Sequence, residues 1–140
     1  MYSLLFGIWL FACGPKVLPE LQFSPPSEAQ ETSSGLRYQV LKKGKGKEYP
    51  TENSIVTVHY TGWLSDGSVF DSSIERGQSA TFPLNRVIPG WTEGVQLMRE
   101  GEKAIFWIPV DLAYGKNASS SAPQGDLIFE IELISIITPE

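Results

Sequence analysis

Apolar and polar residues alternate in several runs after residue 36, and this period of two is typical of β-strands with one buried face. In one of these runs Val56, Val58 and Tyr60 fall on one face and His59 falls on the other. The runs predict antiparallel strands that are half-buried, with their apolar faces on a common core. They are LRYQVL at 36–41, IVTVHY at 55–60, AIFWIP at 104–109 and LIFEIELISI at 127–136.

The last two runs divide most clearly into two faces. We expect Glu130 and Glu132 to face water, while the apolar residues of the same run point inward. The inward set in these runs comprises Ala104, Phe106, Ile108, Leu127, Phe129, Ile131 and Leu133. An Asp-Gly pair in SDGS, at 65–68, accepts positive φ and predicts a chain reversal there.

One segment has a helical period instead. In VIPGWTEGVQLMREG, at 87–101, Trp91, Val95 and Met98 form one apolar stripe over a helix of about ten residues. Pro89 is suited to open this helix and Gly101 to close it. The elements together predict an α+β fold, in which a twisted antiparallel sheet of about five strands wraps around one short α-helix.

Length and composition predict one folded domain. The 140 residues, 41% of them hydrophobic, can close one core but hardly two. A net charge of -5 argues against a nucleic-acid partner, and the densest basic stretch, KKGKGK at 42–47, reads as a solvated turn. One histidine and one cysteine exclude a disulfide framework and a metal site built from those residues alone.

The first residues are of a different kind. MYSLLFGIWLFA, at 1–12, is uncharged and too short to cross a bilayer as a helix, as in the apolar region of a signal peptide. Cys13 follows directly and resembles the cysteine that is acylated in bacterial lipoproteins, which predicts a lipid anchor on a signal peptide spanning 1–13. The alternatives are an ordinary signal sequence or a misassigned start with an incidental cysteine.

A Pro- and Ser-rich segment without a helical or strand period follows at 14–33. Its composition predicts a flexible linker, with the folded domain at 34–140. Such a linker would tether the domain near a membrane surface without placing it in the membrane. It is also a poor dimerisation element, so we expect a monomer.

The side chains available for chemistry are mostly aromatic. The only histidine, His59, lies on the strand face opposite Tyr60, and no pair of carboxylates is placed for acid and base catalysis. Strand ends and turns instead carry Tyr60, Phe70, Phe82, Trp91, Tyr114 and Phe129. Each of these alone is more typical of a core. Together with Asp71 they predict an apolar pocket for an uncharged ligand.

Longer motifs make this interpretation more specific. From about Ser34 to Ile136 the chain resembles the FKBP-type peptidyl-prolyl cis-trans isomerases of bacteria, on four segments that occur in the family's order. They are VHYTGWLSDGSVFDSS at 58–73, RGQSATFPLNRVIPGWTEGVQLMREG at 76–101, IPVDLAYG at 108–115 and LIFEIELI at 127–134. The resemblance implies a twisted sheet curled around one short helix, with proline-containing polypeptides as substrates and macrolides of the rapamycin type as inhibitors.

The resemblance also implies the site residues. Trp91 is expected to form the floor of the pocket, and Asp71 and Arg76 to pair at its rim. The Ile88 backbone N–H and the Tyr114 hydroxyl are expected to orient substrate carbonyls, without a metal or other cofactor. The family's pocket positions fall on Tyr60, Phe70, Asp71, Arg76, Val87, Ile88, Trp91, Tyr114 and Phe129, with Phe82 supporting the wall.

The order of leader, linker and isomerase domain resembles exported, lipid-anchored members of the family. It implies a location in a bacterial cell envelope, facing the periplasm or the exterior. The chain departs from the family at KNASSSAPQGD, 116–126, where relatives carry a longer loop ending in an Ile-Pro-Pro run. This Ser-rich flap predicts a more open pocket. It also keeps open a second function, a membrane-tethered, chaperone-like module that binds proline peptides with little turnover.

Overall fold

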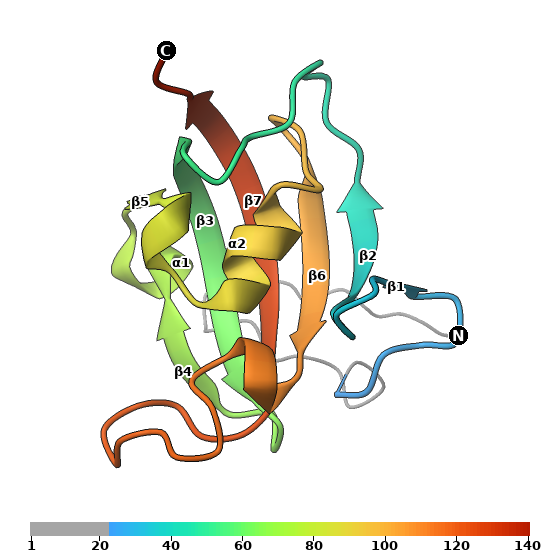
Figure 1. Cartoon of the computed structure of the whole chain (residues 1–140), viewed down its shortest axis with the longest axis vertical. Coiled ribbons are helices and arrows are strands. Elements are labelled where there is room, and N and C mark those ends of the chain that lie inside the picture. Colours follow the sequence, from blue (N-terminus) through green and yellow to red (C-terminus); the bar gives the residue numbers. More distant parts are fainter. Residues whose placement is uncertain (1–22) are drawn as a thin grey trace, which may run out of the picture.

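The computed structural model describes residues 23–140, so the expected signal peptide with Cys13 and the first part of the expected linker lie outside the described residues. Within the described part of the chain, one antiparallel sheet curves around one short helix (Figure 1), as the sequence predicted. The strands are β1 (Gln30–Glu31), β2 (Arg37–Lys42), β3 (Ile55–Leu64), β4 (Val69–Ser72), β5 (Ala80–Pro83), β6 (Lys103–Ile108) and β7 (Leu127–Ile137).

The sheet has seven strands in these residues, so the expected number of about five was too low. The strand order is β1-β2-β6-β7-β3-β4, and β5 pairs with β3 beyond the end of β4. The two strands that the pattern missed are β1, with only two residues, and β5, whose four residues end in Pro83. Neither is long enough to show a period of two.

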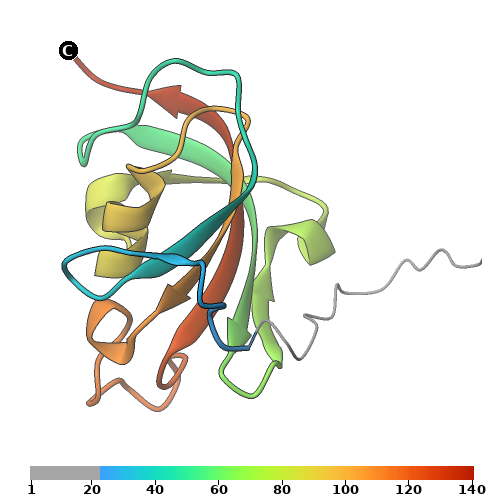
Figure 2. The same cartoon turned by 90° about the vertical axis from the view of Figure 1, so that its right-hand side faces the viewer.

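Helix α2 (Pro89–Val95) lies across the concave face of the sheet, and Figure 2 shows the strands curling around it. Pro89 opens the helix as expected, but the helix ends at Val95 and is shorter than the predicted ten or so residues. Gly101 does not close it. With φ of 88°, Gly101 lies in the turn before β6, where its N–H donates to the Leu133 carbonyl over 2.8 Å.

Two glycines allow α2 to lie close to the sheet. A Cβ on Gly90 would lie 2.6 Å from the Ile108 side chain, and a Cβ on Gly94 would lie 2.7 Å from the Phe106 ring. Both distances are too short for real contacts, so any larger residue would push the helix off β6. The close approach buries Trp91 and Val95 against the strands. Met98 is buried with them, as the stripe predicted, but it lies beyond the end of the helix.

The main core fills the space between α2 and the concave face. It contains Val56, Val58 and Tyr60 from β3 together with the apolar residues that were expected to point inward from β6 and β7. The structure therefore confirms the assignment of faces along these three strands. His59 lies on the opposite face, as expected, and its Nδ1 is 2.9 Å from the Ser73 Oγ.

The convex face carries a second apolar cluster, which the pattern did not predict. Trp63, Ile105, Trp107 and Ile128 are buried there, with Phe23, Ala29 and Val69 packed against them. The strands are thus buried on both faces at this end rather than half-buried. Glu130, expected to face water, is only 6% exposed, because it lies between Thr61 of β3 and Ile105 of β6.

The last part of the expected linker contacts this convex face. Phe23 lies against the hairpin turn at Gly67, and Gln30 and Glu31 form β1, which pairs with β2. The ordered domain therefore begins before Ser34. The sequence pattern missed this because an isolated aromatic residue among prolines and serines carries no period.

Candidate active site

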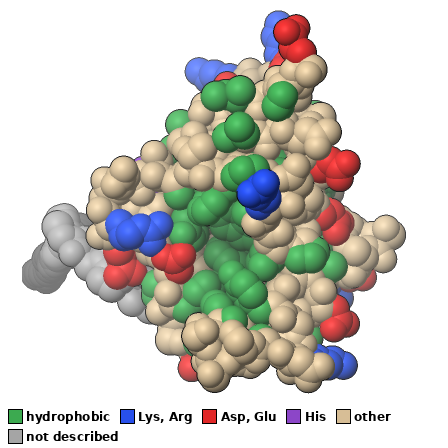
Figure 3. All heavy atoms as spheres, turned by 60° about the vertical axis from the view of Figure 1, so that its left-hand side comes forward, with side chains coloured by type: hydrophobic (Ala, Val, Ile, Leu, Met, Phe, Trp, Pro, Cys, Tyr) green, Lys and Arg blue, Asp and Glu red, His purple; other side chains and the backbone are tan. Residues whose placement is uncertain are grey.

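A cavity of about 430 Å³ opens between α2, the β3–β4 hairpin and the chain after β6. In Figure 3 it is a hollow floored by hydrophobic side chains, with charged side chains at its rim. Its volume lies in the range of ordinary small-ligand pockets. The lining residues are Tyr60, Phe70, Asp71, Phe82, Arg86, Val87, Ile88, Trp91, Tyr114 and Phe129.

Aromatic rings packed edge to face build the floor and walls of the cavity. The Trp91 indole is nearly perpendicular, at 86°, to each of the Tyr60, Phe82 and Phe129 rings, with centroids 5.2 to 5.5 Å apart. Phe70 meets Phe129 at 88° and 5.5 Å. These are favourable ring geometries, so the walls are held in place by each other.

Gly62 makes room for two of these walls. A Cβ at this position would lie 2.7 Å from both the Phe129 and the Phe70 ring. Gly62 shares the concave face of β3 with Tyr60 and pairs with Phe129 and Asp71 in the neighbouring strands. The missing side chain lets the two rings meet directly above the strand.

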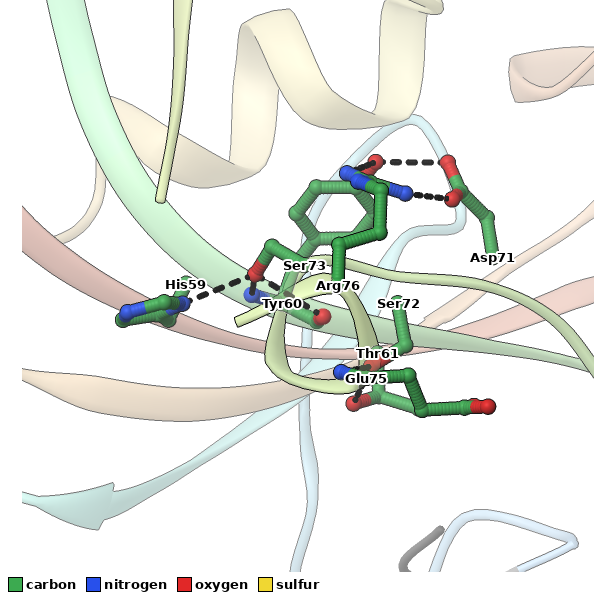
Figure 4. A network of polar contacts seen from close by, with 8 residues as sticks. All are labelled: His59, Tyr60, Thr61, Asp71, Ser72, Ser73, Glu75 and Arg76. Carbon is green, nitrogen blue, oxygen red and sulfur yellow. Dashed lines mark hydrogen bonds and ion pairs between the residues drawn. The ribbon is translucent and has the colours of Figure 1, made fainter. Parts of the chain in front are cut away.

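A polar network holds one edge of the cavity (Figure 4). The Tyr60 hydroxyl donates to Asp71 Oδ2 over 2.5 Å, and Arg76 donates both to Asp71 Oδ1 and, over 3.1 Å, to the Tyr60 oxygen. Both carboxylate oxygens of Asp71 are therefore occupied. Because the guanidinium already compensates its charge, Asp71 positions Tyr60 rather than serving as a general acid or base.

A single helical turn brings Arg76 back over Asp71. Helix α1 (Ser73–Arg76) begins after Ser72, whose hydroxyl accepts from the Glu75 N–H, and it ends at Gly77, where φ is 72°. Ser73 ties the turn to β3, because its hydroxyl accepts from the Tyr60 backbone N–H over 2.8 Å. The tether and the caps place Arg76 and Asp71 on the same side of Tyr60.

The network changes the proton affinity of its members. Burial, followed by the hydrogen bond to Asp71, raises the pKa of Tyr60 above its ordinary value of 10.0. The hydrogen bonds to Tyr60 and Asp71 raise the pKa of Arg76 as well. Tyr60 is therefore a neutral hydroxyl and Arg76 a cation throughout the physiological range.

Two hydrogen-bonding groups at the cavity have no partner in the described part of the chain. The Ile88 backbone N–H donates to no described group, although the Ile88 carbonyl accepts the first hydrogen bonds of α2 from Trp91 and Thr92. The Tyr114 hydroxyl likewise makes no hydrogen bond, and its side chain is 47% exposed. Both groups are free to contact a ligand.

The structure brings the predicted site residues together around one cavity, with a single exception. Arg76 does not line the cavity and acts on it through Asp71 and Tyr60. Arg86, which was not among the predicted residues, does line it. Its place directly before the predicted pair Val87 and Ile88 is the one signal in the sequence that could have identified it.

The Ser-rich segment at 116–126 contributes no lining residue. Its turn is organised internally, since the Gln124 side chain donates to the carbonyls of Ser119 and Ala122 over 2.8 and 3.0 Å. Asp126 anchors the end of the segment by accepting from the Val110 N–H. Tyr114 is therefore the only lining residue that the chain between β6 and β7 contributes.

An aromatic pocket on a twisted antiparallel sheet, floored by the first turn of a short helix, defines a compact ligand-binding α+β domain. The family of FKBP-type peptidyl-prolyl cis-trans isomerases matches residues 46–134. The chain belongs to this family, as its motifs indicated.

Similar proteins agree with this assignment. The chain is 55% identical over 111 residues to the FKBP-type peptidyl-prolyl cis-trans isomerase FkpA of Aeromonas hydrophila, covering 79% of this chain and 41% of that protein. It is 47% identical over 105 residues to the outer membrane protein MIP of Legionella longbeachae, covering 74% of this chain and 45% of that protein. The crystal structure of FkpA from Escherichia coli superimposes with a TM-score of 0.75 at 40% identity, covering 84% of this chain and 55% of that one.

The chain thus spans about half the length of these three relatives. Among residues 23–140, no helix is long and apolar enough to span a bilayer. The same residues hold no cluster of three or more histidine, cysteine or carboxylate side chains suited to a metal ion.

Proposed function

We propose that this chain is a peptidyl-prolyl cis-trans isomerase that assists the folding of exported proteins. The observation that carries the proposal is the cavity itself. Its aromatic walls surround two hydrogen-bonding groups, the Ile88 N–H and the Tyr114 hydroxyl, that find no partner among residues 23–140. Such a site can take a proline ring onto the Trp91 floor and hold the flanking carbonyls of the peptide.

The physical chemistry of the amide bond accounts for catalysis in such a pocket. An X-Pro bond is planar through resonance, and a barrier of about 18 to 20 kcal/mol lies at the twisted form, where the amide loses much of its charge separation. Water stabilises the planar, polar form, whereas an apolar pocket favours the twisted, less polar one. The reaction forms and breaks no covalent bond and requires no cofactor.

The required stabilisation is moderate. Bringing a reaction of tens of seconds to milliseconds needs a factor of about 10⁴, or about 5 to 6 kcal/mol. Removal of the amide from water, together with one or two hydrogen bonds of about 1 kcal/mol net each, is of this order. The neutral Tyr60 hydroxyl, held by Asp71, keeps its part of the wall in position without a net negative charge.

The test is acceleration of X-Pro isomerisation in short peptides, with a matched pair of tyrosine variants. We expect Tyr114→Phe to lower kcat/KM about five- to tenfold, because it loses one hydrogen bond to substrate. Tyr49→Phe removes the same hydroxyl from an exposed tyrosine away from the cavity and leaves kcat/KM unchanged. Exchange no faster than in buffer would refute the proposal and favour the chaperone-like binding module with little turnover.

The position of the Ser-rich flap makes the expected ligand binding more specific. The segment at 116–126 lines no part of the cavity, so Ser121 and Ala122 bury no apolar surface over a bound proline. We expect weaker binding of rapamycin-type macrolides and broader catalysis than in relatives with an apolar flap. Replacing Ser121 by Ile and Ala122 by Pro should tighten macrolide binding several-fold. Unchanged or weaker binding would show that the loop has no bearing on the site.

The sequence and one relative support a proposal about where the protein is located. We propose that Cys13 carries a lipid that holds a monomeric domain in a bacterial cell envelope, facing the periplasm or the exterior. The name of the Legionella relative as an outer membrane protein supports an envelope location. Two acyl chains are expected, because one alone binds a membrane only weakly.

Cys13→Ser should release the protein from the membrane fraction with its isomerase activity intact. A wild-type protein that is already soluble would refute the anchor.

A further inference from the structure

We infer that Arg86 makes this site selective for peptides that carry an acidic residue next to the proline. The inference rests on the proposed isomerase function and adds a substrate class to it. It starts from the charges at the cavity, where Asp71 and Arg86 are the only charged residues in the lining.

Asp71 and Arg86 differ in whether a neighbouring side chain compensates their charge. Asp71 accepts from Tyr60 on one oxygen and from Arg76 on the other, so a bound peptide meets a carboxylate that is already compensated. Arg86 ends the short 3-10 helix η2 (Leu84–Arg86) and is exposed. No carboxylate among residues 23–140 lies within ion-pair distance of its guanidinium.

The neighbouring acidic side chains do not cancel this charge. Glu93 of α2 borders a neighbouring groove, which shares Val87 with the cavity, and it accepts a hydrogen bond from the Ser34 hydroxyl over 2.5 Å. Neither Glu93 nor Asp111, which follows β6, lines the cavity. The mouth of the cavity is therefore locally positive, although the chain as a whole carries a net charge of -5.

An acidic side chain beside the bound proline can pair with this guanidinium, and a basic one meets a like charge. Arginine also offers two parallel donors that match a carboxylate. Because Arg86 is exposed, water and salt weaken the pair, and exposed pairs of this kind correspond to about a two- to fivefold preference. The same exposure makes the preference sensitive to ionic strength.

The experiment compares kcat/KM of the full chain on peptides that differ only beside the proline. Glu-Pro is set against Gln-Pro, and Pro-Glu against Pro-Gln, with Lys-Pro and Leu-Pro as further substrates. We expect the wild-type protein to prefer Glu over Gln about two- to fivefold in at least one position. The preference should shrink towards one when NaCl rises from 0.1 M to about 1 M, where the screening length falls from about 10 to 3 Å.

Two variants and one control assign the preference to Arg86. Arg86→Ala should abolish the Glu-to-Gln preference, and Arg86→Glu should reverse it in favour of Lys. Lys45→Ala removes one positive charge from an exposed lysine beside Gly101, outside the cavity, and should keep the wild-type ratio. Because each comparison is a ratio of kcat/KM values measured on the same variant, a general loss of activity in that variant cancels.

The outcomes separate this inference from the function on which it rests. If Leu-Pro exchange is not accelerated at all, the isomerase function itself fails. If all peptides are accelerated but Glu and Gln are treated alike, or if Lys45→Ala changes the ratio as much as Arg86→Ala does, the selectivity of Arg86 is refuted.

Discussion

The two faces of the sheet are both apolar, but the chain covers them in different ways. On the convex face, Phe23 and Ala29 pack against the cluster of Trp63 and Trp107, and a second cavity of about 400 Å³ remains beside Phe23 and Trp107. On the concave face, α2 is one short helix that covers the strands only in part, and a cavity of about 430 Å³ remains beside it. The two cavities are similar in volume, but the concave one is walled by rings packed edge to face and holds two hydrogen-bonding groups, the Ile88 N–H and the Tyr114 hydroxyl, that have no partner in the described part of the chain.

The largest effect is expected from a substitution that disrupts the convex cluster. Trp63 is fully buried there, so Trp63→Ala should lower the free energy of unfolding by about 3 to 5 kcal/mol in urea denaturation. The kcat/KM of the folded fraction should not change, because the side chain lies on the face away from the cavity.

Trp63→Phe is the milder companion of this variant. It keeps a buried ring and removes an indole N–H that finds no partner among the described residues, so it should destabilise the protein less. Loss of activity in parallel with stability, while the protein remains folded, would show that the two faces are not independent.

The next largest effect is expected from a substitution that distorts only the concave face. In Gly62→Ala the new methyl group collides with Phe70 and Phe129, and we expect a cost of about 1 to 3 kcal/mol. If the rings move into the cavity, kcat/KM should fall tenfold or more, since each factor of ten corresponds to about 1.4 kcal/mol.

Thr57→Ala, on the convex face of the same strand, is the control for Gly62→Ala. It removes only an exposed hydroxyl that lies 3.0 Å from the Thr81 hydroxyl, and both stability and activity should be close to wild type. A fully active Gly62→Ala protein would show that the rings yield without affecting the site.

A smaller effect tests whether Phe23 packs against the convex face. Phe23 is half-buried against the hairpin turn, and Phe23→Ala should lower the free energy of unfolding by about 1 to 2 kcal/mol, with unchanged kcat/KM. Glu28→Ala, in the same segment but exposed, is the control. An unchanged urea midpoint for Phe23→Ala would contradict the contact.

The smallest effect concerns the titration of Tyr60. Its pKa in the folded protein is raised above 10.0, so it holds its proton more strongly in the folded than in the unfolded state. Its contribution to stability is therefore complete below pH 10 and is lost as the pH rises through the folded pKa. Carbon-13 labelling of the tyrosines, followed by NMR, resolves its titration from the other four.

Two variants should move this pKa in opposite directions. Asp71→Asn replaces the carboxylate by a neutral amide, so it removes the negative charge and weakens the hydrogen bond that raise the pKa of Tyr60, and should lower that pKa. Arg76→Gln removes a positive charge that lowers it, and should raise it further. Shifts of the same sign in both variants would mean that the network in solution differs from the one described.

Sequence motifs identified most of the candidate site, but they did not reveal the state of its charges. The residues that line the cavity stand in long motifs, so their identity could be predicted, whereas Arg86 follows no aromatic pattern and was missed. Asp71 is occupied on both oxygens, while Arg86 has no ion-pair partner among residues 23–140, and this difference depends on how α1 and η2 turn. Such turns span only a few residues and have no period to detect.

The sequence by itself determined which strand faces meet α2, because burial of one face requires an alternation that is visible along β3, β6 and β7. It did not determine that the opposite face is buried as well. Only the tertiary structure decided this, since the cover comes from Phe23 and Ala29, far from Trp107 along the chain. Such cover depends on which distant segment lies over a strand, and a local pattern contains no information about that.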